Sequence, residues 1–165
     1  DMLLELLQTL IEGGHKSVVF SQYTRMLGII REDLENMGIK FSYLDGSSKN
    51  RLEIVKNFNK DPSIKVFLVS LKAGGTGLNL VGADTVIHYD MWWNPAVENQ
   101  ATDRVYRIGQ DKAVSKYKLV TLGTIEEKIL SMQNRKKKLV KDMIHSDEEA
   151  LSKLSWEDVL ELLQT

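Results

Sequence analysis

The chain of 165 residues is 42% hydrophobic and 27% charged, which fits one compact globular domain and is too short for two full ones. Its 22 lysines and arginines nearly balance 23 aspartates and glutamates, so a net charge of -1 excludes a strong overall attraction to polyanions, and any nucleic-acid contact requires a local patch. The absence of cysteine excludes disulfides and thiolate metal sites and favours an intracellular protein.

The first predicted element is an amphipathic helix over residues 1–12, stopped by glycines at 13–14. Glu5, Gln8 and Glu12 recur at helical intervals, and the segment begins with an acid and lacks a basic flank, so it differs from a signal peptide. No run approaches the roughly 18 apolar residues of a membrane span, so we expect no membrane partner. The three histidines lack ligand spacing, so we also expect no metal site.

Short β-branched or aromatic runs then alternate with longer helical patterns. Three of the first four runs are almost wholly apolar, which is typical of strands in a sheet covered on both faces. The predicted strands span residues 17–20, 40–44, 65–69, 85–89 and 113–120.

Two helices are predicted between these strands. Residues 24–38 end on a glycine, as helices often do, and within residues 47–62 Leu52, Val55 and Phe58 recur every three positions. Alternating strands and helices indicate right-handed parallel crossovers. The sequence therefore predicts an α/β fold, a doubly wound parallel sheet flanked by helices.

Three more helices are predicted in the second half of the chain. Residues 94–109 have Pro95 at the first helical position, where its missing N–H costs nothing, and Gly109 past the end. Residues 124–144 form a long helix with an apolar side, which we expect to lie across the core, and residues 155–163 form a small terminal helix.

The loops at the carboxyl ends of the strands are the candidate sites, because parallel sheets bind ligands there. The loop over residues 69–80 has three glycines in four residues, which suits either an anion-binding turn or a tight structural turn. It lacks the GK[ST] of a Walker phosphate cradle. By itself, this pattern favours a solvated side chain at Lys72.

Other strand ends carry residues that either support the fold or contact a partner. Of the adjacent Trp92 and Trp93, one is expected to anchor the following helix and the other to face a partner, because adjacent residues rarely bury in the same direction. Residues 20–24 and 44–48 hold hydroxyl, amide and turn residues, which suit helix capping and also contact with phosphate oxygens.

One face of the helix predicted over residues 94–109 carries Gln100, Asp103, Arg104 and Arg107 within an arc of about 100°. An ion-pair face is the commoner explanation of such a stripe. Two arginines near a strand-end cleft can instead stabilise the charge of a transferring phosphoryl group, a role worth about 10³ to 10⁵ in rate. The neighbouring stripe is apolar and can pack on the sheet; it consists of Val97, Ala101, Val105 and Ile108.

The order of these motifs closely resembles the second RecA-like lobe of the Swi/Snf-type chromatin-remodelling, DNA-translocating ATPases of helicase superfamily two. The resemblance runs from residue 16 to 123, and DRVYRIGQ after WWNP is highly specific. It implies a RecA-like lobe over residues 1–123 and C-terminal brace and tail helices over 124–165. The segments that carry it are VVFSQYT, LDGSS, VSLKAGGTGLNL, DTVIHYDMWWNP and ENQATDRVYRIGQ.

The resemblance also implies roles for individual residues. Gln100, Arg104 and Arg107 reach across a cleft to ATP bound on the first lobe, with both arginines acting as fingers, and Gly75 touches the nucleotide. The DNA backbone is contacted by Gln22, Tyr23, Ser47, Ser48, Ser70, Lys72 and Trp93.

The chain departs from the family pattern in two respects. Where the family commonly has Ser-Thr-Arg before Ala-Gly-Gly, this chain has Ser70, Leu71 and Lys72. Leucine in place of threonine removes a hydroxyl, and lysine in place of arginine replaces a guanidinium that can form two parallel hydrogen bonds with a single ammonium charge. No GxGK[ST] and no DExH-type carboxylates occur, so ATP and Mg²⁺ are expected to bind mainly on an N-terminal lobe of the same protein.

The expected function is that of the C-terminal motor lobe of a double-stranded DNA translocase that remodels protein–DNA complexes. A stand-alone DNA- or protein-binding module and the lobe of a strand-separating helicase are the alternatives. The same resemblance suggests DNA-bound proteins as further partners, and a location in the cytoplasm or nucleoid of a bacterium or archaeon, or in the nucleus of a eukaryote. The basic run within residues 134–141 fits either a solvated surface or a patch for DNA or an acidic protein.

Overall fold

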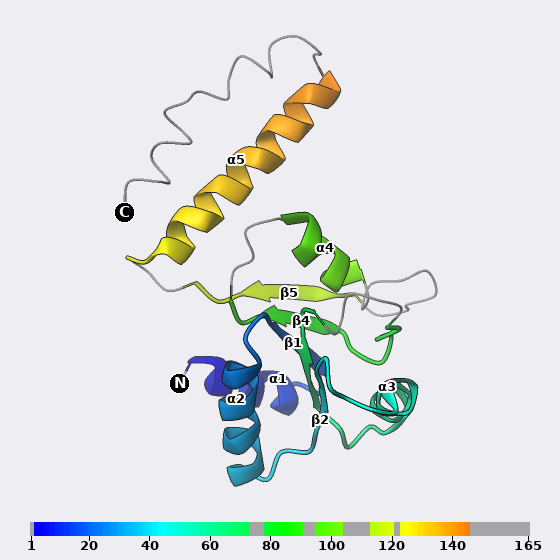
Figure 1. Cartoon of the computed structure of the whole chain (residues 1–165). Helices are drawn as coiled ribbons and strands as arrows, with labels where there is room; N and C mark the ends of the chain where they lie inside the picture. The colour runs from blue at the N-terminus through cyan, green and yellow to red at the C-terminus, as the bar shows by residue number, and fades with distance from the viewer. Residues whose placement is uncertain (1, 73–77, 91–94, 104–112, 121–122, 146–165) are drawn as a thin grey trace.

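The centre of the molecule is a five-stranded parallel sheet with strand order β2-β3-β1-β4-β5 (Figure 1). The predicted doubly wound α/β fold is confirmed, and each strand lies within two residues of its expected ends. The computed structural model describes residues 2–72, 78–90, 95–103, 113–120 and 123–145. The strands are β1 (Ser17–Ser21), β2 (Phe41–Leu44), β3 (Val66–Ser70), β4 (Thr85–His88) and β5 (Ser115–Lys118).

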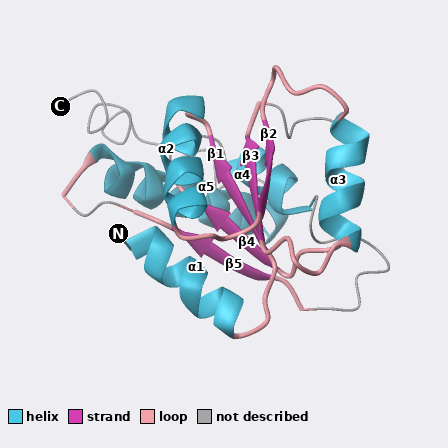
Figure 2. Cartoon of the chain, turned by 90° about the horizontal axis from the view of Figure 1, so that it is seen from below, coloured by secondary structure: helices cyan, strands magenta, loops and turns pink. Residues whose placement is uncertain are grey.

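Helices cover both faces of this sheet (Figure 2). Because strand side chains alternate, Val18 and Phe20 join the apolar cluster with α3 and α4, whereas Val19 joins the cluster with α1 and α2. The all-apolar strands predicted from the sequence are therefore explained by two separate cores. The helices are α1 (Met2–Glu12), α2 (Thr24–Asn36), α3 (Arg51–Lys60), α4 (Pro95–Asp103) and α5 (Ile125–His145).

Glycines end the first two helices, as the sequence predicts. Gly14 has φ +79° and Gly38 has φ +68°, a left-handed conformation in which a Cβ would add strain. Directly after them, the His15 amide donates to the Leu10 carbonyl at 2.9 Å and the Ile39 amide to the Leu34 carbonyl at 3.0 Å. Each turn thereby pairs a carbonyl of the final helical turn and directs the chain into the next strand.

The apolar spacing in α3 does not describe its buried face. Val55 and Phe58 are buried, but Leu52 is 82% exposed. The half-buried side chain is instead Ile54, which packs against the same cluster. At about 100° per residue, positions 54, 55 and 58 lie on one side of the helix and Leu52 lies beyond its margin.

Helix α5 is long, as predicted, but the expectation that it lies across the core is wrong. Neither apolar cluster includes a described residue of α5, and Ile125 is 54% exposed. The helix meets the sheet at its edge strand, where Lys118 Nζ of β5 donates to the buried Gln133 side chain at 3.1 Å. Figure 1 shows α5 on the β5 side of the molecule. The terminal helix predicted at residues 155–163 lies outside the described residues.

The described helices include none that is both long and apolar enough to cross a membrane.

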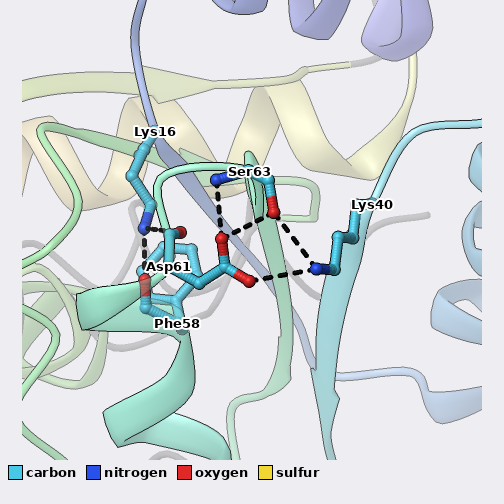
Figure 3. A network of polar contacts seen from close by, with 5 residues as sticks. All are labelled: Lys16, Lys40, Phe58, Asp61 and Ser63. Atoms are coloured by element: carbon cyan, nitrogen blue, oxygen red, sulfur yellow. Dashed lines mark hydrogen bonds and ion pairs between the residues drawn. The ribbon is translucent and has the colours of Figure 1, made fainter.

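A polar network joins the segments that lead into β1, β2 and β3 (Figure 3). Lys16 Nζ donates to the carbonyls of Phe58 and Asp61, and lies 4.3 Å from the Phe58 ring centroid. Lys40 Nζ lies 3.0 Å from Asp61 Oδ2. The Ser63 hydroxyl and amide donate to Asp61 Oδ1 at 2.6 and 2.9 Å. These bonds stabilise the edge of the sheet at which the strands begin, which we call the amino edge. The carboxyl ends of the strands lie at the opposite edge.

The hydrogen bonds from Ser63 and then from Lys40 hold the pKa of Asp61 well below its usual range. A carboxylate with a lowered folded pKa stabilises the fold above its ordinary pKa near 4, and this contribution disappears as the pH falls below that value. We therefore expect Asp61→Asn to lower the thermal midpoint at pH 7, with the difference from wild type shrinking below about pH 4. Thermal unfolding followed by circular dichroism across this pH range measures the difference.

Glu32→Gln, on the exposed side of α2, is the matched control and should leave the midpoint unchanged at each pH. A difference between Asp61→Asn and wild type that stayed constant down to about pH 2 would show that the Asp61 charge does not carry this stabilisation.

Candidate functional site

The carboxyl edge of the sheet gathers loops that are far apart in the sequence. Ser21 and Ser70 are register partners at the ends of β1 and β3, Leu44 of β2 is paired with Val69, and Phe20 with His88 of β4. The segments that follow these strands are residues 22–23, 45–48, 71–72 and 89–90, and we call them the carboxyl edge. Most of the described candidate DNA contacts of the sequence lie there.

The loop after β1 is fixed by hydrogen bonds to the buried Asp90 carboxylate. The Ser21 hydroxyl donates to Asp90 Oδ2, and the Gln22 amide donates to Oδ1 at 3.1 Å. The Tyr23 amide in turn donates to the Ser21 oxygen at 3.1 Å. Tyr23 precedes α2 without a side-chain cap, so the capping interpretation of this loop is wrong. Its side chain is 58% exposed and Gln22 is half-buried.

The loop after β2 is organised by a second aspartate. Asp45 Oδ1 accepts from the Ser47 amide at 2.8 Å and the Ser47 hydroxyl at 2.7 Å, and Oδ2 accepts from the Tyr43 hydroxyl at 3.0 Å. The Ser48 hydroxyl accepts from the Asp45 amide at 2.9 Å. Neither serine caps α3, whose first flanking residue, Asn50, is left-handed with φ 55° and makes no side-chain cap.

The charge of Asp45 is stabilised by these donors. The hydrogen bonds from Ser47 lower the pKa of the Asp45 carboxyl below its usual range, although partial burial opposes them. Burial raises the pKa of Tyr43, and its bond to the charged Asp45 adds to the effect. At neutral pH the loop therefore holds an ionised carboxylate beneath an exposed Ser47 and a half-buried Ser48.

The end of β3 separates a buried residue from an exposed one. Ser70 is 2% exposed, so its side chain does not reach the surface, whereas Lys72 is exposed. Leu71 is buried in the cluster with α3 and α4, and its amide donates to the Ser21 carbonyl at 2.9 Å. Leu71, which stands where the family pattern has a hydroxyl residue, thus packs in the core.

Helix α4 is attached to the sheet through β4. His88 is buried, stacks on Phe20 with ring centroids 5.7 Å apart, and its Nε2 lies 3.2 Å from the Thr102 hydroxyl. Ala101 packs in the cluster with α3, while Gln100 is exposed, as the two predicted stripes require. Four candidates lie outside the described residues: Gly75, Trp93, Arg104 and Arg107.

Sequence reasoning identified the surface residues of these loops but not the residues beneath them. Asp45, His88 and Asp90 were not predicted as part of the site. Each had a weak signal: an acid directly after a strand in two cases, and a histidine inside an apolar run in the third. Within the part of the chain that the structure describes, no group of three histidine, aspartate or glutamate side chains is arranged to hold a metal ion.

Residues 1–109 match the family described as helicase conserved C-terminal domain. The chain is 41% identical to an ATP-dependent helicase of Mycoplasma genitalium, over 98% of this chain and 16% of the relative. It is 42% identical to helicase SWR1 of Yarrowia lipolytica, over 97% of this chain and 9% of the relative. For the chromatin-remodeling ATPase INO80 of Aspergillus oryzae the identity is 46%, over 85% of this chain and 10% of the relative.

Among solved structures, the C-terminal part of the Fun30 ATPase domain matches with a TM-score of 0.76 and 40% identity, covering 79% of this chain and 43% of that one. The resemblance found from the motifs is thereby confirmed. The chain spans only 9% to 16% of the length of the three curated relatives above.

Removing the Asp45 carboxylate should loosen the loop after β2. In Asp45→Ala the Ser47 amide and hydroxyl lose their acceptor, so we expect hydrogen exchange at the Ser47 amide to quicken by about tenfold. Asp45→Asn keeps one acceptor oxygen and should give a smaller change. Equal exchange in wild type and Asp45→Ala, measured by NMR, would mean that the carboxylate does not hold this turn.

Proposed function

The chain belongs to the helicase conserved C-terminal domain family, with Snf2-type chromatin-remodelling ATPases among its relatives, and on that basis we propose that it is the C-terminal motor lobe of a double-stranded DNA translocase. The lobe occupies residues 1–123, and residues 124–165 form the brace and tail. The whole protein uses ATP to move along DNA and so remodels protein–DNA complexes. The observation that carries this proposal is the carboxyl edge, which brings exposed polar residues of separate loops together at one edge of the sheet.

The carboxyl edge supplies the grip on the DNA backbone. Tyr23, Ser47 and Lys72 are exposed there and offer a phenol, a hydroxyl and a cation to phosphate oxygens. Gln22 and Ser48 contribute from half-buried positions, and Trp93 lies against the duplex. Ser70 supports the end of β3 beneath these contacts, because its side chain is buried. Since none of these loops resembles a reader of base edges, binding is independent of sequence.

The segment from Gln100 to Arg107 supplies the contacts to the nucleotide. Arg104 and Arg107 act as arginine fingers on the γ-phosphate, with Gln100 beside them and Gly75 at the nucleotide. ATP and Mg²⁺ are held mainly by the N-terminal lobe of the same protein, because this chain has no Walker sequence. Closure of the two lobes on ATP completes the site and shifts the grip on DNA. The chain by itself hydrolyses no ATP.

A strand-separating helicase is the second candidate, and the names of two relatives, both called helicases, favour it. Displacement of a labelled strand from a duplex distinguishes the two, because a translocase that leaves the strands paired consumes ATP without releasing the label. A binding module without ATPase activity would show neither reaction.

Arg104→Ala, in the protein carrying both lobes, should lower the DNA-stimulated rate of ATP hydrolysis by about 10³ or more, because an arginine finger stabilises charge that develops in the transition state. Asp103→Ala is the matched control at the neighbouring position, because Asp103, the last residue of α4, is exposed. If the only role of Arg104 were an ion pair with Asp103, both substitutions would lower the rate of ATP hydrolysis only slightly and by similar amounts. A wild-type rate in Arg104→Ala would remove the finger assignment.

Binding to duplex DNA should weaken linearly on a log–log scale as salt rises, with a slope of about -0.9 per neutralised phosphate. Lys72→Ala should make this slope shallower by about one unit, because one phosphate contact is lost. Lys60→Ala, an exposed lysine in the last turn of α3, should leave the slope unchanged. Affinity that is independent of salt would exclude a grip on the backbone.

A further inference from the structure

Asp90 is a buried carboxylate that the proposed contacts do not use. It is 4% exposed and lies two residues past the end of β4, before residues 91–94 and α4. A carboxylate is almost never buried to this extent unless it is hydrogen-bonded or paired, because removing the charge from water is costly. The hydrogen-bond donors to the Asp90 carboxylate therefore indicate the role of this residue.

Both of its oxygens accept hydrogen bonds from the loop after β1. Oδ2 accepts from the Ser21 hydroxyl and Oδ1 from the Gln22 amide at 3.1 Å, and the Ser21 oxygen accepts from the Tyr23 amide at 3.1 Å. Three successive residues are thus fixed, directly or through one atom, by a single carboxylate. The backbone hydrogen bond from the Tyr89 amide to the Phe20 carbonyl, at 2.9 Å, joins β1 and β4 one residue earlier in both segments. The bonds of Asp90 therefore continue the connection between these two segments past the end of the strand pairing.

The same strand end also holds α4. His88, two residues before Asp90, stacks on Phe20 and lies 3.2 Å from the Thr102 hydroxyl. The end of β4 therefore connects the loop of Gln22 and Tyr23 to the helix that bears Gln100.

We propose that Asp90 is a positioning residue for DNA binding, whose carboxylate fixes the backbone of residues 21–23 so that Gln22 and Tyr23 meet the DNA backbone already in place. This inference rests on the proposed function and adds a residue that touches neither DNA nor ATP. A loop ordered in advance loses less conformational entropy on binding, so loosening it weakens the affinity for DNA without changing the chemical step.

Asp90→Asn, in the protein carrying both lobes, tests this role. The carboxamide has nearly the same shape but only one acceptor oxygen, and its NH₂ group faces a donor, so one of the two loop donors loses its partner. We expect the concentration of duplex DNA needed for half-maximal stimulation of ATP hydrolysis to rise about tenfold. The kcat at saturating DNA should stay within about twofold of wild type, because a residue that touches neither DNA nor ATP leaves the chemical step unchanged.

Asp84→Asn is the matched control. Asp84 precedes β4 at the other end of the strand, where it accepts from the Thr85 hydroxyl at 3.0 Å and lies 2.9 Å from His15 Nδ1. A general weakening of β4 would affect both variants, whereas only Asp90→Asn should change the DNA requirement. Ser21→Ala should raise that requirement on its own, and the double variant should show less than the product of the two effects, since both act through one bond.

The outcomes separate the inference from the proposed function. Wild type is measured first, and if duplex DNA does not stimulate its ATP hydrolysis, the proposed function fails. If DNA stimulates wild type and Asp90→Asn needs no more DNA than wild type, the positioning role alone is overturned. A lower kcat with an unchanged DNA requirement overturns it as well, because Asp90 would then act on the chemical step.

Discussion

Parallel pairing of adjacent strands is the constraint on which the rest of this molecule depends. Because β1 to β4 run in the same direction and in close register, loops separated by tens of residues emerge together at one edge. Hydrogen bonding of the backbone alone brings residues 22–23 beside 71–72 and 89–90. The candidate site is therefore a consequence of topology first and of side-chain chemistry second.

The two edges of the sheet use aspartates for different purposes. At the amino edge, Asp61 ties the entries of β2 and β3 together through Lys40 and Ser63, far from any candidate contact. At the carboxyl edge, Asp45 and Asp90 each satisfy backbone amides and hydroxyls of a loop, which leaves neighbouring polar side chains facing outward. Both loops at the carboxyl edge are thus fixed by a carboxylate that accepts their hydrogen bonds.

The family pattern is changed at one position where the change is structural. Leu71 replaces a hydroxyl residue and is buried in the core beside α3 and α4, so the segment before the glycines is fastened more by apolar packing. The adjacent Lys72 remains exposed and keeps a positive charge at the edge. A buried apolar side chain and an exposed cation are therefore adjacent at the end of β3.

The sequence by itself determined the elements, their order and the family. Hydrophobic runs of strand length, helical periodicity and the glycines at 14 and 38 are local signals, so they could be read without a fold. The exposed Leu52, the placement of α5 at the β5 edge, and the roles of Asp45 and Asp90 could not. Ser21 and Asp90 are 69 residues apart, and only the pairing of β1 with β4 in the folded sheet brings the hydroxyl and the carboxylate within bonding distance.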